Sequence, residues 1–163
     1  MPCVSGSGKN ILRSLVYSNI MVVHSPLFRL SLAQDVGYCN ESIRTVEDWD
    51  FWLRCAQAGA KFVYHKAAMD MALVRVHGAS CSNNEISMLE STLAMRKTLV
   101  GSFADTELER LNLARQSCVL YKLARLKFAR GKVLPAIRNL AKALLILSSP
   151  AVLGCALKVH VLK

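Results

Sequence analysis

Hydrophobic and polar positions along this chain follow helical spacing over most of its length, and the clearest example is residues 45–58. Apolar side chains recur there at i, i+3, i+4 and i+7, namely Trp49, Trp52, Leu53 and Ala56. This spacing places them on one face of a helix. Thr45 and Asp48 resemble a capping box at its start, and Gly59 is suited to its end. The pattern therefore predicts a helix with one buried face.

Shorter patterns lie on both sides of this helix. The apolar run at residues 20–23 is brief and contains Ile and Val, as buried strands often do. Ser25 and Pro26 are typical of an N-cap and a first helical position, and Gly37 is typical of a left-handed helix end. The expected helices before residue 85 are 10–18, 26–34 and 45–58, and the expected strands are 20–23, 61–65 and 71–76. This mixture predicts an α/β fold class for the first half of the chain.

From residue 86 onward the pattern becomes helical throughout. The expected helices are 86–99, 106–129, 133–147 and 152–161. Gly131 supplies the turn between the middle two. The chain therefore divides into a leader with a first helix (1–18), a mixed part (19–85) and an all-helical extension (86–163).

Composition and charge separate these parts further. Hydrophobic residues make up 53% of the chain, which excludes wholesale disorder. Residues 1–85 carry eight basic and seven acidic side chains, whereas residues 86–163 carry thirteen basic and four acidic ones. No acidic residue follows Glu109, although eleven Lys and Arg do. The net charge of +10 therefore belongs almost entirely to the helical extension.

The cysteines and the longest apolar runs bear on the compartment. The six cysteines are widely spread and form no Cys-x-x-Cys pair, a pattern that suits reduced thiols better than a disulfide framework. No uninterrupted apolar stretch approaches the roughly 18 residues that a membrane-spanning helix needs. The N-terminus also lacks the apolar core of a signal peptide. These features predict a cytoplasmic protein, with peripheral attachment to the inner face of the membrane as an option.

The candidate chemistry lies at the start of the helix predicted at 45–58. Glu47 and Asp48 are adjacent carboxylates where a loop enters the helix, and a helix N-terminus stabilises their anionic form. Trp49 and Trp52 offer the flat apolar surface on which sugar rings stack, and Arg54 can fix this helix to a neighbour. A plainer interpretation also holds, in which the acids cap the helix and the tryptophans belong to the core.

Residues 47–54, Glu-Asp-Trp-Asp-Phe-Trp-Leu-Arg, resemble the Glu-Asp segment of family 2 glycosyltransferases with the GT-A fold. Residues 19–20, 25–29 and 36–38 are similar to the family's segment before that pair, and residues 73–77 and 80–82 are similar to its Arg-x-His-x-x-Ser strand and loop. The likeness extends over residues 19–82 with the motifs in the family's order. It implies the acceptor-side part of a GT-A sheet with its helices.

The resemblance also implies an activity and roles for five residues. The reaction would be inverting transfer of a sugar from a nucleotide-sugar donor to a hydroxyl of a saccharide or lipid-linked acceptor, as in cell-envelope polysaccharide synthesis. Asp48 would be the general base that takes the proton of the attacking hydroxyl, and Glu47 would orient the acceptor. Trp49 and Arg75 would contact the substrate. His77 would approach a Mn²⁺ or Mg²⁺ ion on the donor diphosphate.

The chain departs from the family in one respect. Relatives place the nucleotide-binding strands and an Asp-x-Asp metal motif well before the Glu-Asp pair. Here 46 residues precede Glu47, and they contain no Asp-x-Asp. Without those parts the leaving diphosphate has no preorganised cation, and electrostatic stabilisation is usually the largest catalytic term. The sequence therefore predicts a transferase fragment that is inactive by itself.

The basic extension has two interpretations. Helices that combine apolar and basic residues, as residues 110–163 do, can lie on an anionic membrane surface. They can also form a packed hairpin with a solvated basic face. Nucleic-acid binding is not expected, because the chain has no docking motif or aromatic platform. The alternative to a transferase is a noncatalytic helical interaction or membrane-surface module in which Glu47 and Asp48 are idle.

Overall fold

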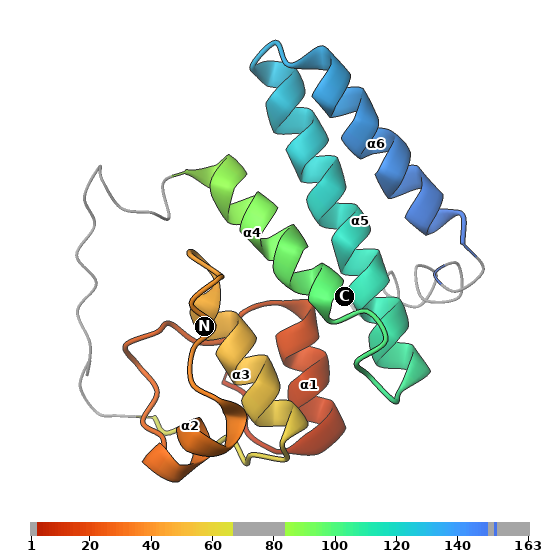
Figure 1. The fold of residues 1–163 in the computed structure, drawn as a ribbon. Helices are drawn as coiled ribbons and strands as arrows, with labels where there is room; N and C mark the ends of the chain where they lie inside the picture. Colours follow the sequence, from red (N-terminus) through yellow and green to blue (C-terminus); the bar gives the residue numbers. More distant parts are fainter. Residues whose placement is uncertain (1–2, 67–83, 150–151, 153–163) are drawn as a thin grey trace. The chain divides into compact units, whose positions relative to one another are not determined.

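The structure is a computed structural model that describes residues 3–66, 84–149 and 152. The chain splits into two compact units, Met1–Asn83 and Asn84–Lys163. In the described residues, helices α1 to α3 belong to the first unit and α4 to α6 to the second (labelled in Figure 1).

The first unit is built around helix α3 (Glu47–Gln57), which packs against α1 (Gly8–Tyr17) and α2 (Leu30–Val36). The apolar spacing explains this, because α3 buries the side chains predicted for its inner face: Trp49, Trp52, Leu53 and Ala56. From α1, the buried partners are Ile11, Leu15 and Val16. The predicted helix at 45–58 is confirmed, and so is the helix at 10–18 apart from small shifts at its ends.

The helix predicted at 26–34 begins later than expected. The structure places α2 at Leu30–Val36 with Arg29 at its N-cap position. Ser25 does not cap a helix, because its hydroxyl donates a hydrogen bond back to the Val22 carbonyl at 3.0 Å. The predicted end is right: Gly37 has φ 81°, the left-handed conformation that favours glycine.

The expected sheet is not formed in the described residues, so the predicted α/β fold class with a partial GT-A sheet is wrong. The described residues contain helices and one isolated antiparallel bridge, between Gly6 and Phe62. At 20–23 the chain turns instead, since the Asn19 side-chain oxygen accepts from the Met21 amide at 3.3 Å. The expected strand at 71–76 lies outside the described residues. What the structure describes is all-α.

The second unit consists of α4 (Glu85–Thr98), α5 (Thr106–Ala129) and α6 (Val133–Leu147). Side-chain caps begin the first two: Asn84 accepts from the Ser87 amide at 3.2 Å, and Asp105 accepts from the Glu107 amide at 2.7 Å. Gly131, at φ 71°, makes the turn between α5 and α6. The helices predicted at 86–99, 106–129 and 133–147 are therefore confirmed, and most of the one predicted at 152–161 lies outside the described residues.

Helices α5 and α6 lie side by side as a hairpin (Figure 1). The contact uses small side chains of α6, since Ala136 and Ala143 are its buried residues. The Ser117 hydroxyl donates to the Ala143 carbonyl at 3.1 Å in this buried seam. Alanines allow the two backbones to approach closely, so the larger side chains of α6 are left outside the seam. None of the helices in the described ranges is long and apolar enough to cross a membrane.

Candidate functional site

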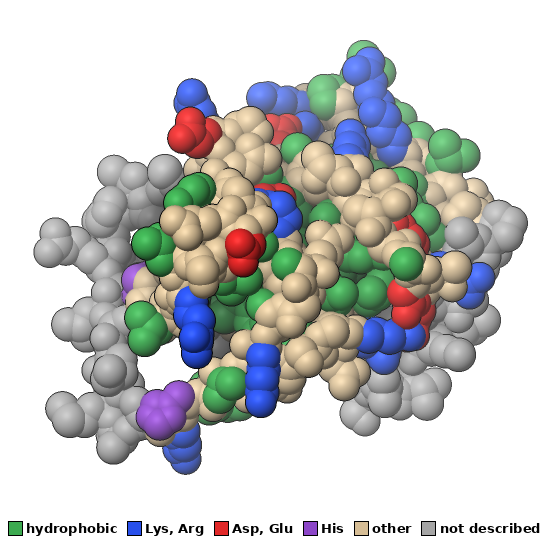
Figure 2. All heavy atoms as spheres, turned by 60° about the horizontal axis from the view of Figure 1, so that its bottom comes forward, with side chains coloured by type: hydrophobic (Ala, Val, Ile, Leu, Met, Phe, Trp, Pro, Cys, Tyr) green, Lys and Arg blue, Asp and Glu red, His purple; other side chains and the backbone are tan. Residues whose placement is uncertain are grey.

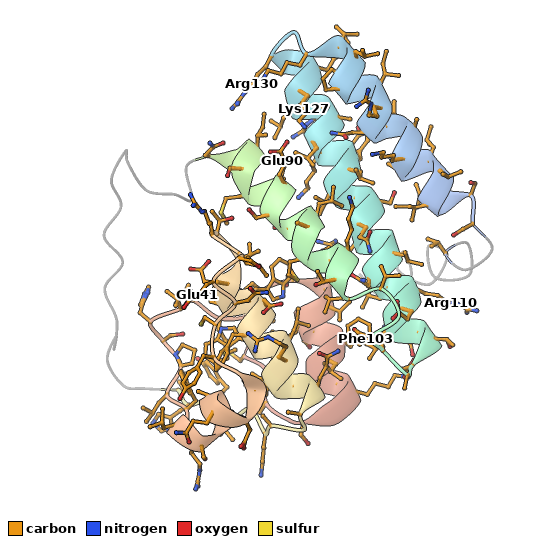
Figure 3. All side chains as sticks on the ribbon, viewed as in Figure 1. Glu41, Glu90, Phe103, Arg110, Lys127 and Arg130 are labelled. Atoms are coloured by element: carbon orange, nitrogen blue, oxygen red, sulfur yellow. The ribbon has the colours of Figure 1, made fainter. Side chains whose placement is uncertain are left out.

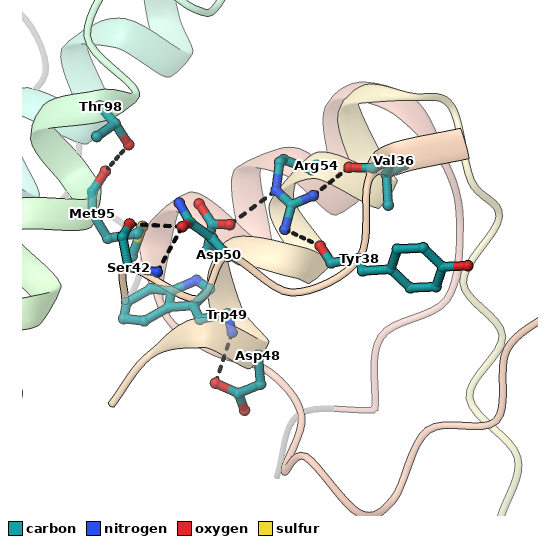
Figure 4. A network of polar contacts seen from close by, with 10 residues as sticks. Val36, Tyr38, Ser42, Asp48, Trp49, Asp50, Arg54, Met95 and Thr98 are labelled. Atoms are coloured by element: carbon teal, nitrogen blue, oxygen red, sulfur yellow. Dashed lines mark hydrogen bonds and ion pairs between the residues drawn. The ribbon is translucent and has the colours of Figure 1, made fainter. Parts of the chain in front are cut away.

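The carboxylates proposed for chemistry lie at the N-terminus of α3. Glu47, Asp48 and Asp50 all occupy its first turn, where the helix dipole favours negative charge. The Asp48 carboxylate accepts two hydrogen bonds, from the Trp49 amide at 2.7 Å and from the Asn19 side-chain nitrogen at 3.1 Å. Asp48 is half-buried, and these two hydrogen bonds hold its carboxylate in position (Figure 4 draws the bond from the Trp49 amide).

The capping box suggested by Thr45 and Asp48 is not formed. Val46 is the N-cap residue of α3, and no side chain caps it. The Thr45 hydroxyl oxygen and Oε2 of Glu47 are buried and have no hydrogen-bond partner in the part of the chain that the structure describes. Glu47 and Asp48 are thus neighbours in sequence with different surroundings, because only Asp48 is fixed by a partner from outside its helix.

The two tryptophans belong to the core of the first unit. Trp49 is 9% exposed, and its indole nitrogen donates to the Leu15 carbonyl at 2.7 Å, which joins α3 to α1. Trp52 packs against two phenylalanine rings, with centroid distances of 4.9 Å to Phe51 and 5.5 Å to Phe28. These contacts favour the structural interpretation of both residues, and substrate contact by Trp49 stays a prediction.

Arg54 joins α3 to the C-terminal end of α2 and to the residues just after it. Its guanidinium pairs with Asp50 at 2.9 Å and also donates to the carbonyls of Val36 and Tyr38 (Figure 4). The same side chain lies over the Phe51 ring, 5.7 Å from its centroid. The sequence-based expectation that Arg54 fixes this helix to its neighbour is confirmed, and Asp50 is the partner that compensates its charge.

Two of the five predicted site residues, Arg75 and His77, lie outside the described residues. Within the described residues, no group of three or more His, Cys, Asp or Glu side chains could hold a metal ion. His77, the residue expected to approach a Mn²⁺ or Mg²⁺ ion, lies outside these residues, so the metal stays a prediction.

The second unit contains an exposed apolar surface that the sequence patterns did not single out. Seven of the fifteen residues of α6 are large aliphatic side chains exposed to solvent: Val133, Leu134, Ile137, Leu140, Leu144, Leu145 and Leu147. On a helical projection they share one side of α6, next to the seam with α5. We call them the α6 apolar face. Arg138 and Lys142, both exposed, lie beyond its outer margin.

Most cations of the hairpin form no ion pair with any residue that the structure describes. Lys127 pairs with Glu90 of α4 at 2.7 Å, and Arg110 and Arg130 lie near the two ends of α5 (Figure 3). On the face drawn in Figure 2, Lys and Arg side chains are interspersed with hydrophobic and acidic ones. Beyond Glu107 and Glu109 in the first turn of α5, no residue of the hairpin is acidic, so its positive charge is neutralised only in part.

A pocket of about 360 Å³ lies along the α5–α6 hairpin. Its apolar lining includes Leu140, Leu144 and Leu147 of α6, which also belong to the α6 apolar face. Lys122 and Arg125 line it from α5. The pocket therefore combines an apolar wall with two basic side chains. Sequence reasoning missed it, although the i, i+3 spacing of Lys122 and Arg125 does place both on one side of a helix.

A polar cluster is buried between α4 and α5. Arg96 is 1% exposed, and its carbonyl accepts from the side-chain nitrogens of Asn112 at 3.0 Å and Gln116 at 3.3 Å. Burial, followed by the nearby charge of Arg115, lowers the pKa of Arg96 to about 10. The guanidinium stays charged at neutral pH. The cluster joins two helices of the second unit, which is a structural role.

Comparison with protein-family models, with curated proteins and with solved structures finds no match to this chain. The expected membership of glycosyltransferase family 2 is therefore corrected. No family model supports it, and the described residues form helices without the sheet that a GT-A fold requires. A short Glu-Asp segment at a helix start is compatible with many helical proteins, since acids are favoured there on electrostatic grounds alone.

Proposed function

We propose that this protein is a noncatalytic helical module that binds an anionic membrane surface through the α6 apolar face. The observation that carries the proposal is the exposure of seven large aliphatic side chains on a helix whose buried residues are two alanines. A helix packed in a globular protein normally turns its large apolar side chains toward the core. An exposed apolar face of this kind marks an interaction site.

The available apolar surface is large enough to support binding. Leu134, Ile137 and Leu145 are 69%, 57% and 74% exposed, which together equal about two fully exposed aliphatic side chains. Complete burial of one such side chain stabilises by about 1.5–3 kcal/mol. These three residues alone would therefore contribute at least about 3 kcal/mol when the face enters the boundary between headgroups and acyl chains.

The charge of the hairpin favours an anionic surface. Residues 110–149 carry nine basic side chains and no acidic one. Each basic group near an anionic leaflet contributes about 1 kcal/mol, and the contribution falls off within a Debye length. The combination of an apolar helix face with flanking cations is typical of helices that lie in the interface plane. A cytoplasmic location at the inner face of the membrane follows from this proposal, together with the scattered, unpaired pattern of the cysteines in sequence.

Vesicle sedimentation tests the proposal. The full chain is mixed with vesicles of phosphatidylglycerol or of phosphatidylcholine, and the bound fraction is measured after centrifugation. We expect binding to phosphatidylglycerol and at least about tenfold weaker binding to phosphatidylcholine. The triple variant L134S/I137S/L145S should lower the affinity for phosphatidylglycerol about a hundredfold, which corresponds to about 3 kcal/mol.

The matched control removes three exposed aliphatic side chains from the first unit. Leu27, Leu30 and Val63 are exposed at comparable levels, so L27S/L30S/V63S changes overall hydrophobicity in the same way. The control should bind vesicles as the wild type does. Circular dichroism establishes that both triple variants stay helical. If neither vesicle type binds the wild-type chain, or if both triple variants lose binding equally, the proposal is rejected.

Sugar transfer is the second candidate function, and the fixed position of Asp48 is the observation that favours it. A half-buried carboxylate held by Asn19 at a helix N-terminus is suited to accept a proton from an acceptor hydroxyl. Glu47 would orient that acceptor, and a nucleotide sugar would be the donor. This candidate predicts that short oligosaccharides shift the NMR signals of Asn19 and Asp48 in the wild type, with weaker binding in Asp48→Asn. Identical binding by both proteins, or none, rejects it.

A further inference from the structure

The pocket along the α5–α6 hairpin has the composition of a site for an amphiphile. Its volume of about 360 Å³ lies at the lower end of the range of small-molecule sites, about 300–1,000 Å³. Tyr121, Leu144 and Leu147 line it with exposed carbon surface. Ser117, which also lines it, already donates its hydroxyl proton to the Ala143 carbonyl. The wall therefore favours an apolar group over a sugar or a nucleotide.

The basic side chains of the pocket define the other end of the ligand. Lys122 and Arg125 are exposed, lie three residues apart on α5 and form no ion pair with any residue that the structure describes. A guanidinium and an ammonium on one helix side can both donate to phosphate oxygens. We propose that this pocket binds one acyl chain of an anionic phospholipid, with Lys122 and Arg125 at its phosphate.

This inference rests on the proposed function and makes it specific. The α6 apolar face would attach the hairpin to the membrane surface, and the pocket would take up a single lipid from it. Charge complementarity is the reason for choosing this ligand. A neutral lipid leaves Lys122 and Arg125 without an anion, whereas a free phosphate ion leaves the apolar wall in contact with water.

The experiment uses lipids that stay monomeric in solution, so that surface attachment does not contribute. The full chain, labelled at its Leu methyl groups, is titrated with dihexanoyl-phosphatidylglycerol, dihexanoyl-phosphatidylcholine or glycerol phosphate and observed by NMR. We expect saturable shifts of the Leu144 and Leu147 methyl groups with the anionic lipid. The neutral lipid and glycerol phosphate should each bind at least about tenfold more weakly.

Two charge-reversal variants assign the role of the cations. K122E/R125E should weaken binding of the anionic lipid at least about tenfold. R138E/K142E makes the same change in net charge on α6, at positions that do not line the pocket, and should stay within about twofold of wild type. A third variant, Cys118→Phe, places a ring at the pocket wall and should weaken binding of the acyl chain while the cations stay in place.

The outcomes separate this inference from the proposed function. Vesicle binding without any monomeric lipid binding overturns the pocket and leaves surface attachment intact. Equal affinity for both lipids, or for glycerol phosphate and the anionic lipid, also overturns the pocket assignment. If the chain self-associates at NMR concentrations, Cys118→Phe abolishes the association and the Leu144 and Leu147 methyl groups do not respond to lipid, a second copy occupies the pocket and the inference is wrong. Monomeric lipid binding that survives in L134S/I137S/L145S, with loss of vesicle binding, supports both.

Discussion

Replacement of Arg54 by lysine is the sharpest test of how the first unit is held together. Lysine keeps the positive charge and an apolar stem, but its single ammonium cannot reach the three oxygens that the guanidinium contacts, on Asp50, Val36 and Tyr38. Two of the three hydrogen bonds should therefore be lost. The C-terminal end of α2 would then be attached to α3 by fewer contacts, while the pair with Asp50 is retained in part.

The magnitude follows from the burial of the pair. A hydrogen bond that involves a charged group contributes about 1.5–3 kcal/mol when it is well shielded. The side chain of Arg54 is 27% exposed and that of Asp50 is 9% exposed, so solvent weakens these bonds. We expect Arg54→Lys to lower the free energy of unfolding by about 2 kcal/mol. Arg54→Ala should cost about 3 kcal/mol, because it leaves the buried Asp50 carboxylate without its cation.

Tryptophan fluorescence during urea unfolding measures the free energy of unfolding of the first unit. The chain has two tryptophans, both buried in α3, so the signal reports on the first unit alone. A loss of about 2 kcal/mol should lower the urea midpoint by about 1 M. Arg44→Lys is the matched control, since Arg44 is exposed and should change stability by less than about 0.5 kcal/mol. An Arg54→Lys midpoint equal to that of the control would refute the reasoning.

Three further predictions concern single groups and the charge of the hairpin. Trp49→Phe removes the bond to the Leu15 carbonyl and should lower the stability of the first unit by about 1 kcal/mol, measured by the fluorescence of Trp52. Burial raises the pKa of the Cys55 thiol from 9.0 to about 11, so the unfolded chain loses this proton first and stability should fall as pH rises from 9 to 11. Urea unfolding across that range should show the fall in wild type and a smaller one in Cys55→Ala. Vesicle binding should weaken as NaCl is raised from 0.05 to about 0.5 M, because salt screens the cations of the hairpin, and an affinity independent of salt would contradict their role.

The helices were predictable where apolar spacing was regular. The inner face of α3 and the ends of α5 follow from residues close together in sequence, such as the cap at Asp105 and the turn at Gly131. The run at residues 20–23 shows the limit of this reasoning. It has the composition of a strand, but a strand needs a partner, and Asn19 instead makes a local bond to the Met21 amide.

The sites were harder to predict because they depend on contacts between distant residues. Asp48 was singled out from its position, whereas its partner Asn19 lies 29 residues away and could not be inferred. In α6 the sequence indicates an apolar helix without indicating which side packs. In the structure Ala136 and Ala143 form the seam with α5, because their small side chains allow the two helices to approach closely. The leucines of α6 therefore stay exposed. The exposed face is therefore a tertiary property, and periodicity alone does not predict it.

Spin labels placed around α6 test the central claim most directly. Labels at 137 and 145 lie on the α6 apolar face, and a label at 142 lies beyond it, in a chain whose native cysteines are replaced by serine. With phosphatidylglycerol vesicles, labels at 137 and 145 should gain accessibility to oxygen and lose accessibility to a water-soluble nickel reagent, while the label at 142 should stay exposed to water. If all three labels respond alike, or if none responds to vesicles, α6 does not lie in the membrane interface and the account is wrong.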